Sequence, residues 1–133
     1  MPGSRKPFSY ALLRLVPRLD RGEQLNVGVV LFCRQHGAFL SVRSAVDEDR
    51  MTVLSPNLDV NDVRAQLHAL ELVAAGDPAG GPVALLDPSE RFGWLVAPSS
   101  TVIQPSEVHT GLSADPNAEL GQLFVKLVAA PTV

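Results

Sequence analysis

The segment from 99 to 111 holds most of the side chains in this chain that could do chemistry. His109 is a candidate general base, because an imidazole changes its charge near neutral pH. Glu107 lies two residues earlier, so in an extended segment both side chains point to the same side. No recognisable catalytic triad accompanies them, and a histidine that anchors a loop fits the same residues. The sequence leaves His109 open as a catalytic or a structural residue.

Hydroxyl and amide side chains precede this histidine. Ser99, Ser100 and Thr101 could offer hydroxyl and backbone N–H groups to an anion, and Gln104 belongs to the same polar segment. Serine and threonine at such a position also bond to the carbonyls that a preceding helix leaves open. The ligand-binding interpretation assigns Ser100, Thr101 and Gln104 to a site together with His109, and the local interpretation stays beside it.

An arginine and an asparagine in the apolar first part of the chain are the other candidates. Arg14 lies in the alternating segment 8–16, and Asn26 lies in the run 24–33, where Val, Leu and Phe dominate. If these segments pair as neighbouring strands, both side chains can point into one groove, where Arg14 binds an anion. The alternative is an internal polar network that fixes the strand pairing, since buried polar groups need partners.

The single cysteine and the lack of known motifs limit the chemistry further. Cys33 has no second cysteine to pair with, and a nucleophilic role would need a nearby base, so we expect a buried structural thiol. No spacing of histidine, cysteine and carboxylate resembles a structural zinc site. The chain has no Walker loop, dinucleotide-binding glycine motif or nucleophile elbow. We therefore expect no metal and no cofactor.

Length and composition indicate a single cytoplasmic domain. A chain of 133 residues with 46% hydrophobic residues can bury a core without metal or disulfide. The net charge of −3 argues against a dedicated nucleic-acid surface, and no apolar run approaches membrane-spanning length, so neither partner is expected. We expect residues 1–6 to form a loose N-terminus and residues 7–133 a single α+β domain.

Three strands are predicted early in the chain, over 8–16, 24–33 and 38–43. Short charged or glycine-containing turns separate them, so a mainly antiparallel sheet that starts as a three-stranded meander is the simplest arrangement. Gly28 lies inside the second strand, where a glycine often marks a bulge or a close backbone approach. Helices are expected to pack on this sheet, and the polar segment after residue 100 is expected to fold back across it near Arg14 and Asn26.

Four aspartates mark the expected helix starts: Asp47, Asp59, Asp87 and Asp115. Gly76 fits the end of the second and longest helix. We also predict an edge strand over 83–86, a strand over 101–103 and a polar loop over 104–114. Glu90 and Arg91 read as a solvated helix start, and Trp94 as a core residue.

Several stretches together resemble a bacterial family catalogued as domain of unknown function 3037. The resemblance covers nearly the whole chain and is carried by 8–17, 21–32, 90–92, 100–105 and 109–111. Its most specific parts are Asn26-Val27-Gly28-Val29 and Gln104-Pro105 followed by His109-Thr110-Gly111. The family brings no established activity. Its members resemble the products of genes that neighbour proteins with a kinase-like fold of the HipA type, which implies an accessory or regulatory partner.

Two function hypotheses follow from these observations. The first is a non-enzymatic binding or regulatory module that partners a HipA-like kinase-fold protein. The second is a small enzyme that acts on a phosphorylated or nucleotide-like ligand through Arg14, Asn26, Ser100, Thr101 and His109. A homodimer built through the sheet or the last helix is a third, structural possibility.

Overall fold

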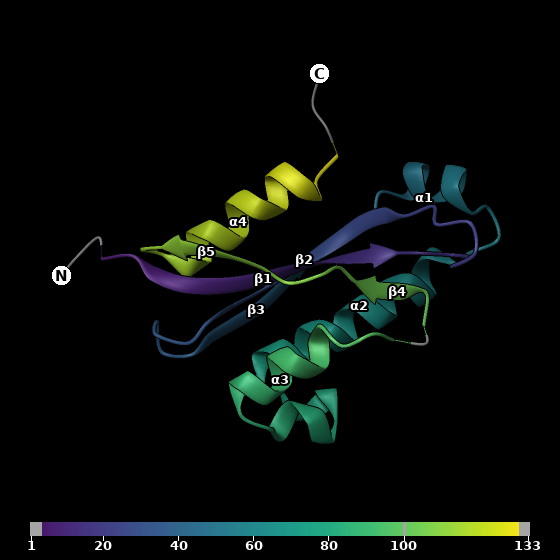
Figure 1. The fold of residues 1–133 in the computed structure, drawn as a ribbon. Coiled ribbons are helices and arrows are strands. Elements are labelled where there is room, and N and C mark those ends of the chain that lie inside the picture. Colours follow the sequence, from purple (N-terminus) through teal and green to yellow (C-terminus); the bar gives the residue numbers. More distant parts are fainter. Residues whose placement is uncertain (1–3, 100, 131–133) are drawn as a thin grey trace.

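The computed structural model describes residues 4–99 and 101–130 as a five-stranded antiparallel sheet with helices on both faces (Figure 1). The strands are β1 (Lys6–Leu15), β2 (Leu25–Cys33), β3 (Phe39–Ser44), β4 (Ile103–Pro105) and β5 (His109–Ser113). Their order is β3-β2-β1-β4, and β5 also pairs with β1. The predicted α+β class and the early meander are confirmed. Lys6, which we had assigned to the loose N-terminus, already pairs with Ser113.

β1 is the strand on which the sheet is assembled. β2 pairs along one side of it, while β4 and then β5 pair along the other side. The polar loop predicted over 104–114 is therefore largely wrong, and the strand predicted over 101–103 begins only at Ile103. The physical reason is that β1 is apolar and buried, so the N–H and C=O groups on its second side need a strand partner.

A serine bridges the break between β4 and β5. Two residues of β1, Ala11 and Leu12, lie opposite the three residues 106–108, because Leu13 pairs with Pro105 and Tyr10 with His109. The backbone N–H of the buried Ser106 donates to the Leu12 carbonyl over 2.8 Å, and its Oγ accepts from the Leu12 N–H, also over 2.8 Å. The hydroxyl thus accepts a backbone hydrogen bond that a strand carbonyl would otherwise accept, and β4 and β5 both stay paired along the same side of β1.

A second irregularity lies between β1 and β2. Leu13 pairs with Gly28 but Arg14 pairs with Asn26, which leaves Val27 as an extra residue. A Cβ on Gly28 would lie 3.2 Å from Leu13 Cδ1 and 3.3 Å from the Arg43 carbonyl oxygen. The predicted bulge and close approach at Gly28 are confirmed, and the shift brings Asn26 directly opposite Arg14.

Each of the four helices begins directly after one of the aspartates that were predicted to cap it. They are α1 (Glu48–Leu54), α2 (Val60–Ala75), α3 (Pro88–Leu95) and α4 (Pro116–Leu127), and each preceding aspartate accepts a backbone N–H bond. Gly76 ends α2 with φ of 70°. The edge strand predicted over 83–86 is wrong: Pro78–Gly80 and Pro82–Leu85 form two short 3₁₀ turns, η1 and η2. A proline at the first position of each turn fixes a helical φ there.

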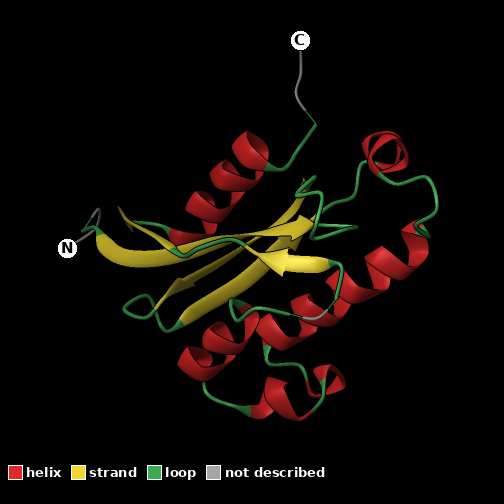
Figure 2. Cartoon of the chain, turned by 45° about the vertical axis from the view of Figure 1, so that its right-hand side comes forward, coloured by secondary structure: helices red, strands yellow, loops and turns green. Residues whose placement is uncertain are grey.

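Two apolar layers lie on opposite faces of the sheet (Figures 1 and 2). α4 covers one face, where its apolar side packs on β1 and β2 through Phe8, Leu12, Val29, Leu31 and Leu120. α2 and α3 lie on the other face, which contains Leu13, Leu15, Val30, Leu67 and Leu95, and α1, at one end of the sheet, adds Met51 to the same apolar cluster (Figures 1 and 2). Cys33 is a buried free thiol, as predicted. Within the described ranges, no helix has the length and apolar character needed to cross a membrane.

Candidate functional site

Three of the predicted site residues form a row across the sheet. Asn26 on β2 and Gln104 on β4 each lie directly opposite Arg14 on β1. Directly opposite residues of antiparallel strands project from the same face. The late polar segment does return to Arg14 as predicted, but as strands β4 and β5 that extend the sheet beside β1 and not as a loop across it. We call Asn26, Arg14 and Gln104 the polar row.

The two amides of the polar row already bond to the backbone of the chain. Asn26 Nδ2 donates to the carbonyl of Leu127, the last residue of α4, over 3.0 Å. Gln104 Nε2 donates to the carbonyls of Ser99 and Thr101 over 2.5 and 2.6 Å, and its Oε1 accepts from the Ser99 N–H. Asn26 therefore satisfies the open end of α4, and Gln104 fixes the turn that leads into β4.

Arg14 is the member of the row with an open hydrogen-bonding group. Its side chain is half-buried, and its buried Nε has no hydrogen-bond partner among the described residues. A buried N–H without a partner costs about 1–3 kcal/mol. A guanidinium fork pairs well with a carboxylate or phosphate. Arg14 is thus the residue of the row that has capacity left for an anion.

His109 lies on the same face as Arg14 but at a distance. It pairs with Tyr10, and the two ring centroids are 5.2 Å apart. Its Nε2 lies 3.8 Å from Glu107 Oε1, and its side chain is 43% exposed. Tyr10 and Arg14 are separated by four residues along β1, about 13 Å in a strand. This spacing along the strand matches a ligand of nucleotide length better than a single phosphate.

The hydroxyls before β4 bond to one another and to their own turn. Thr101 Oγ1 donates to the Ile103 carbonyl over 3.2 Å and accepts from the Ile103 N–H over 3.3 Å. Ser99 Oγ accepts from the Thr101 N–H over 3.2 Å. These bonds stabilise the turn itself, rather than the end of the preceding helix. Ser100, the remaining predicted ligand residue, lies outside the described residues.

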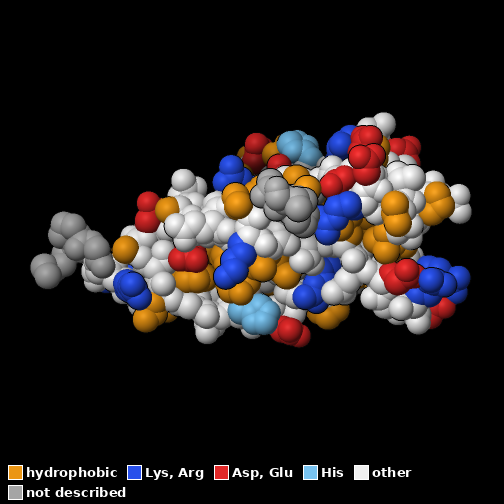
Figure 3. Space-filling view, turned by 90° about the horizontal axis from the view of Figure 1, so that it is seen from above, with side chains coloured by type: hydrophobic (Ala, Val, Ile, Leu, Met, Phe, Trp, Pro, Cys, Tyr) orange, Lys and Arg blue, Asp and Glu red, His pale blue; other side chains and the backbone are white. Residues whose placement is uncertain are grey.

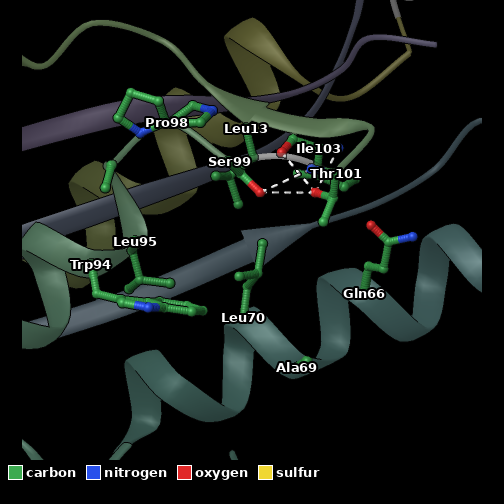
Figure 4. Close-up of a pocket in the computed structure, with 12 residues that line it drawn as sticks. Leu13, Gln66, Ala69, Leu70, Trp94, Leu95, Pro98, Ser99, Thr101 and Ile103 are labelled. Atoms are coloured by element: carbon green, nitrogen blue, oxygen red, sulfur yellow. Dashed lines mark hydrogen bonds between the residues drawn. The ribbon is translucent and has the colours of Figure 1, made fainter. Parts of the chain in front are cut away.

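A cavity of ≈ 430 Å³ lies between α2, α3 and β4, on the side of the sheet opposite α4. Figure 4 shows Gln66 and Leu70 projecting from α2 toward the segment that carries Ser99 and Thr101, with Trp94 at one side. The remaining lining is mostly apolar and comes from Leu13, Ala69, Leu95, Ala97, Pro98, Ile103 and Pro105. The cavity thus has walls from two helices and one edge of the sheet.

This cavity was not predicted from the sequence. Trp94 was expected in the core, but it is 47% exposed, because α3 turns Leu95 into the core and leaves the indole on the cavity wall. Gln66 was not singled out at all, although its Oε1 is buried and has no hydrogen-bond partner within the described part of the chain. A polar residue one position before the core residue Leu67 was the available signal.

Arg91 holds the two helices of the cavity together. Its Nη1 donates to the carbonyls of Val73 and Ala74 over 3.0 and 2.6 Å, and its Nε donates to the Leu86 carbonyl over 3.0 Å. The carbonyls of Val73 and Ala74 belong to the open C-terminal end of α2. The expectation of a solvated helix start is therefore wrong for Arg91, since its position on α3 brings the guanidinium onto the end of α2.

Charged side chains of both signs are dispersed over the α4 side of the molecule, where basic, acidic and apolar side chains are interspersed over the surface that is not grey (Figure 3). At the start of α3, a bond from the Glu90 N–H lowers the pKa of Asp87, and Asp87 in turn raises the pKa of Glu90. In the turn before β2, Arg21 lowers the pKa of Glu23. Over residues 4–99 and 101–130, no three or more His, Cys, Asp or Glu side chains gather where they could hold a metal ion.

Comparison with known proteins gives a family without a described activity. A family model described as "Protein of unknown function (DUF3037)" matches residues 10–128. The chain therefore belongs to this family, as the resemblance in 8–17, 21–32 and 109–111 indicated. No curated protein and no solved structure gives a significant match.

Proposed function

We propose that this chain is a non-enzymatic binding or regulatory accessory module that works in the cytoplasm. One observation carries the proposal: the amides chosen from the sequence bond to the chain's own backbone, whereas a mostly apolar cavity lies open on the face of the sheet opposite α4. Acid–base catalysis needs a base within hydrogen-bond reach of the reacting proton. His109 is exposed and Glu107 lies 3.8 Å from it, so this pair is not held as a preorganised catalytic group.

The partner that we propose is a protein with a kinase-like fold of the HipA type. The family resemblance supports this partner, because members of the family resemble the products of genes that neighbour those of HipA-type kinase-fold proteins. The outer side of β5 supports a protein partner as well, since β5 pairs only with β1 among the described strands. An outer strand offers unpaired N–H and C=O groups to a segment of another chain. Val108 and Leu112, which are 43% and 59% exposed, would add apolar contacts there.

Co-purification tests the partner. The chain and a kinase-fold protein of the HipA type are co-expressed with a tag on one of them and then separated by size at micromolar concentration. We expect one peak with the summed mass, and loss of that peak for Leu112→Glu. Leu19→Glu is the matched control, because Leu19 is also exposed but lies in the turn before β2. Separate elution of the two proteins contradicts the proposed partner, and a peak of twice the chain mass indicates the homodimer instead.

A second candidate function is an enzyme that acts on a phosphorylated or nucleotide-like ligand. The specific observation in its favour is that Arg14 has a buried N–H without a partner among the described residues, on the face of the sheet that also carries His109 of β5. Calorimetry with ATP and with inorganic pyrophosphate tests it, using Arg14→Gln and the exposed Arg5→Gln as a matched pair. Binding that disappears only in Arg14→Gln supports an anion site, and no binding in the unmodified chain removes this candidate.

A further inference from the structure

The cavity between α2, α3 and β4 has the size and lining of a small-molecule site. Its volume of ≈ 430 Å³ falls within the range of about 300–1,000 Å³ that is typical of such sites. Its lining contains no charged side chain among the described residues. A charged ligand would lose water there without meeting a countercharge, which is costly. The lining therefore favours an uncharged ligand.

One polar group in this lining has an unmet bond. Gln66 Oε1 is buried and accepts no hydrogen bond within the described residues. Leaving such a group without a partner costs about 1–3 kcal/mol. Because Oε1 has almost no exposed surface of its own, a ligand donor reaches it once the Gln66 side chain turns its amide toward the cavity that the residue lines, and the new bond removes this cost.

The rest of the cavity is held in shape by bonds that a ligand need not form. Gln104 fixes the turn between Ser99 and Thr101 through three hydrogen bonds. Arg91 fixes α3, and with it the wall formed by Trp94, against the end of α2. A site that is ordered before binding loses less entropy when its ligand arrives.

We infer that this cavity binds a small uncharged ligand with an apolar body and one N–H or O–H donor, which bonds to Gln66 Oε1. The apolar body lies against Leu70, Ile103 and the indole of Trp94. This inference deepens the proposed function and rests on it, because it gives the binding module a ligand class. An apolar side chain of a partner protein would fill the same space without a donor, so the donor distinguishes the two occupants.

Trp94 provides a reporter at the site, because it is the only tryptophan of the chain and lines the cavity. The probes are cyclohexanol, which has a hydroxyl donor, and methoxycyclohexane, which has the same ring without a donor. Binding is followed by tryptophan fluorescence and by the single indole signal in a ¹H–¹⁵N spectrum. We expect saturable binding of cyclohexanol with a Kd at least about 5-fold below that of the ether, since an unpaired acceptor disfavours an analogue without the donor.

A matched pair of variants assigns the difference to one residue. Gln66→Leu should bind both probes equally, whereas Gln122→Leu, on the exposed side of α4, should keep the preference for cyclohexanol. The thermal midpoint of Gln66→Leu should not fall, because the change removes a buried group without a partner. Equal affinity of the two probes for the unmodified chain, or a preference that survives in Gln66→Leu, would overturn the inference.

Adding the kinase-fold protein distinguishes a failure of this inference from a failure of the proposed partner. If the chain binds cyclohexanol but forms no complex, the ligand site is supported and the proposed partner is contradicted. A complex that shifts the Trp94 signal, in a chain that binds neither probe, identifies the cavity as a protein docking groove and overturns the small-ligand site.

Discussion

The polar row and the cavity both include residues of the short strand β4, but they differ in whether their polar groups have hydrogen-bond partners. In the row, Asn26 and Gln104 bond to the backbone, so their amides serve the fold. In the cavity, Gln66 has apolar neighbours and a buried oxygen that meets no partner in ranges 4–99 and 101–130. Arg14 is intermediate, because it belongs to the row and its buried Nε likewise has no partner in those ranges.

This difference shows that a polar residue type is weak evidence for a site until its bonds are known. A buried amide must be satisfied somewhere, and the nearest backbone carbonyl usually suffices. The residues that attracted notice in the sequence, Asn26 and Gln104, are satisfied in this way. Gln66 was not among the candidates from the sequence, yet its buried Oε1 has no hydrogen-bond partner in the part of the chain that the structure describes.

The largest effect is expected on the cavity side, from Arg91→Leu. This change removes three bonds to the carbonyls of Val73, Ala74 and Leu86, so we expect the free energy of unfolding to fall by about 2–4 kcal/mol. Denaturant unfolding measures it. Arg64→Leu is the control, because the ion pair of Arg64 with Glu48 is exposed and should contribute less than about 1 kcal/mol. Similar losses for both variants would contradict the role of Arg91 as a clamp.

The next effect is expected at the junction of β4 and β5. Ser106→Ala leaves the Leu12 N–H without its acceptor in a buried position, so a loss of about 1–3 kcal/mol is expected. Hydrogen exchange should show faster exchange of the Leu12 amide in this variant. Ser89→Ala serves as the control, since the bond of Ser89 to Arg34 is exposed and its loss should change little. Unchanged protection of Leu12 would mean that the hydroxyl is not its acceptor.

A smaller effect is expected in the polar row itself. Asn26→Ala removes the bond to the Leu127 carbonyl at the end of α4, and a loss of about 1 kcal/mol is expected. Amide exchange in the last turn of α4 should rise, while exchange in α2 should stay as it was. Asn61→Ala, in the exposed first turn of α2, is the matched control. If Asn26→Ala left the stability unchanged but abolished ATP binding, the row would be a ligand site rather than a structural one.

The smallest effect concerns pH and the start of α3. Because the pKa of Asp87 is lowered in the folded chain, its ionised form stabilises the fold above its unfolded pKa, about 4. This contribution disappears as the pH falls through the lower folded pKa. Asp87→Asn should therefore match the unmodified chain near pH 7 and lose less stability between about pH 5 and 2. The raised pKa of Glu90 acts in the opposite sense, so the comparison is repeated with Glu90→Gln in both chains.

Local patterns in the sequence predicted much of this fold. The four aspartate caps, Gly76, the alternation in 8–16 and the apolar strand-forming run 24–33 specified helix starts and early strands, because capping, side-chain period and strand propensity are short-range effects. The prediction failed where proline decided the backbone, as in Pro82–Leu85, and where a distant strand supplied the partner, as in β5.

What the sequence determined by itself is the set of elements and the α+β class, since these depend on neighbours within a few residues. The tertiary structure decided which polar groups remain open. Gln66 and Trp94 come from different helices and meet β4 only after α2 and α3 pack on the sheet. The bonds of Asn26 and Gln104 likewise depend on where α4 and the turn before β4 come to lie. Whether a polar atom finds a partner is a property of packing, and no short stretch of sequence contains it.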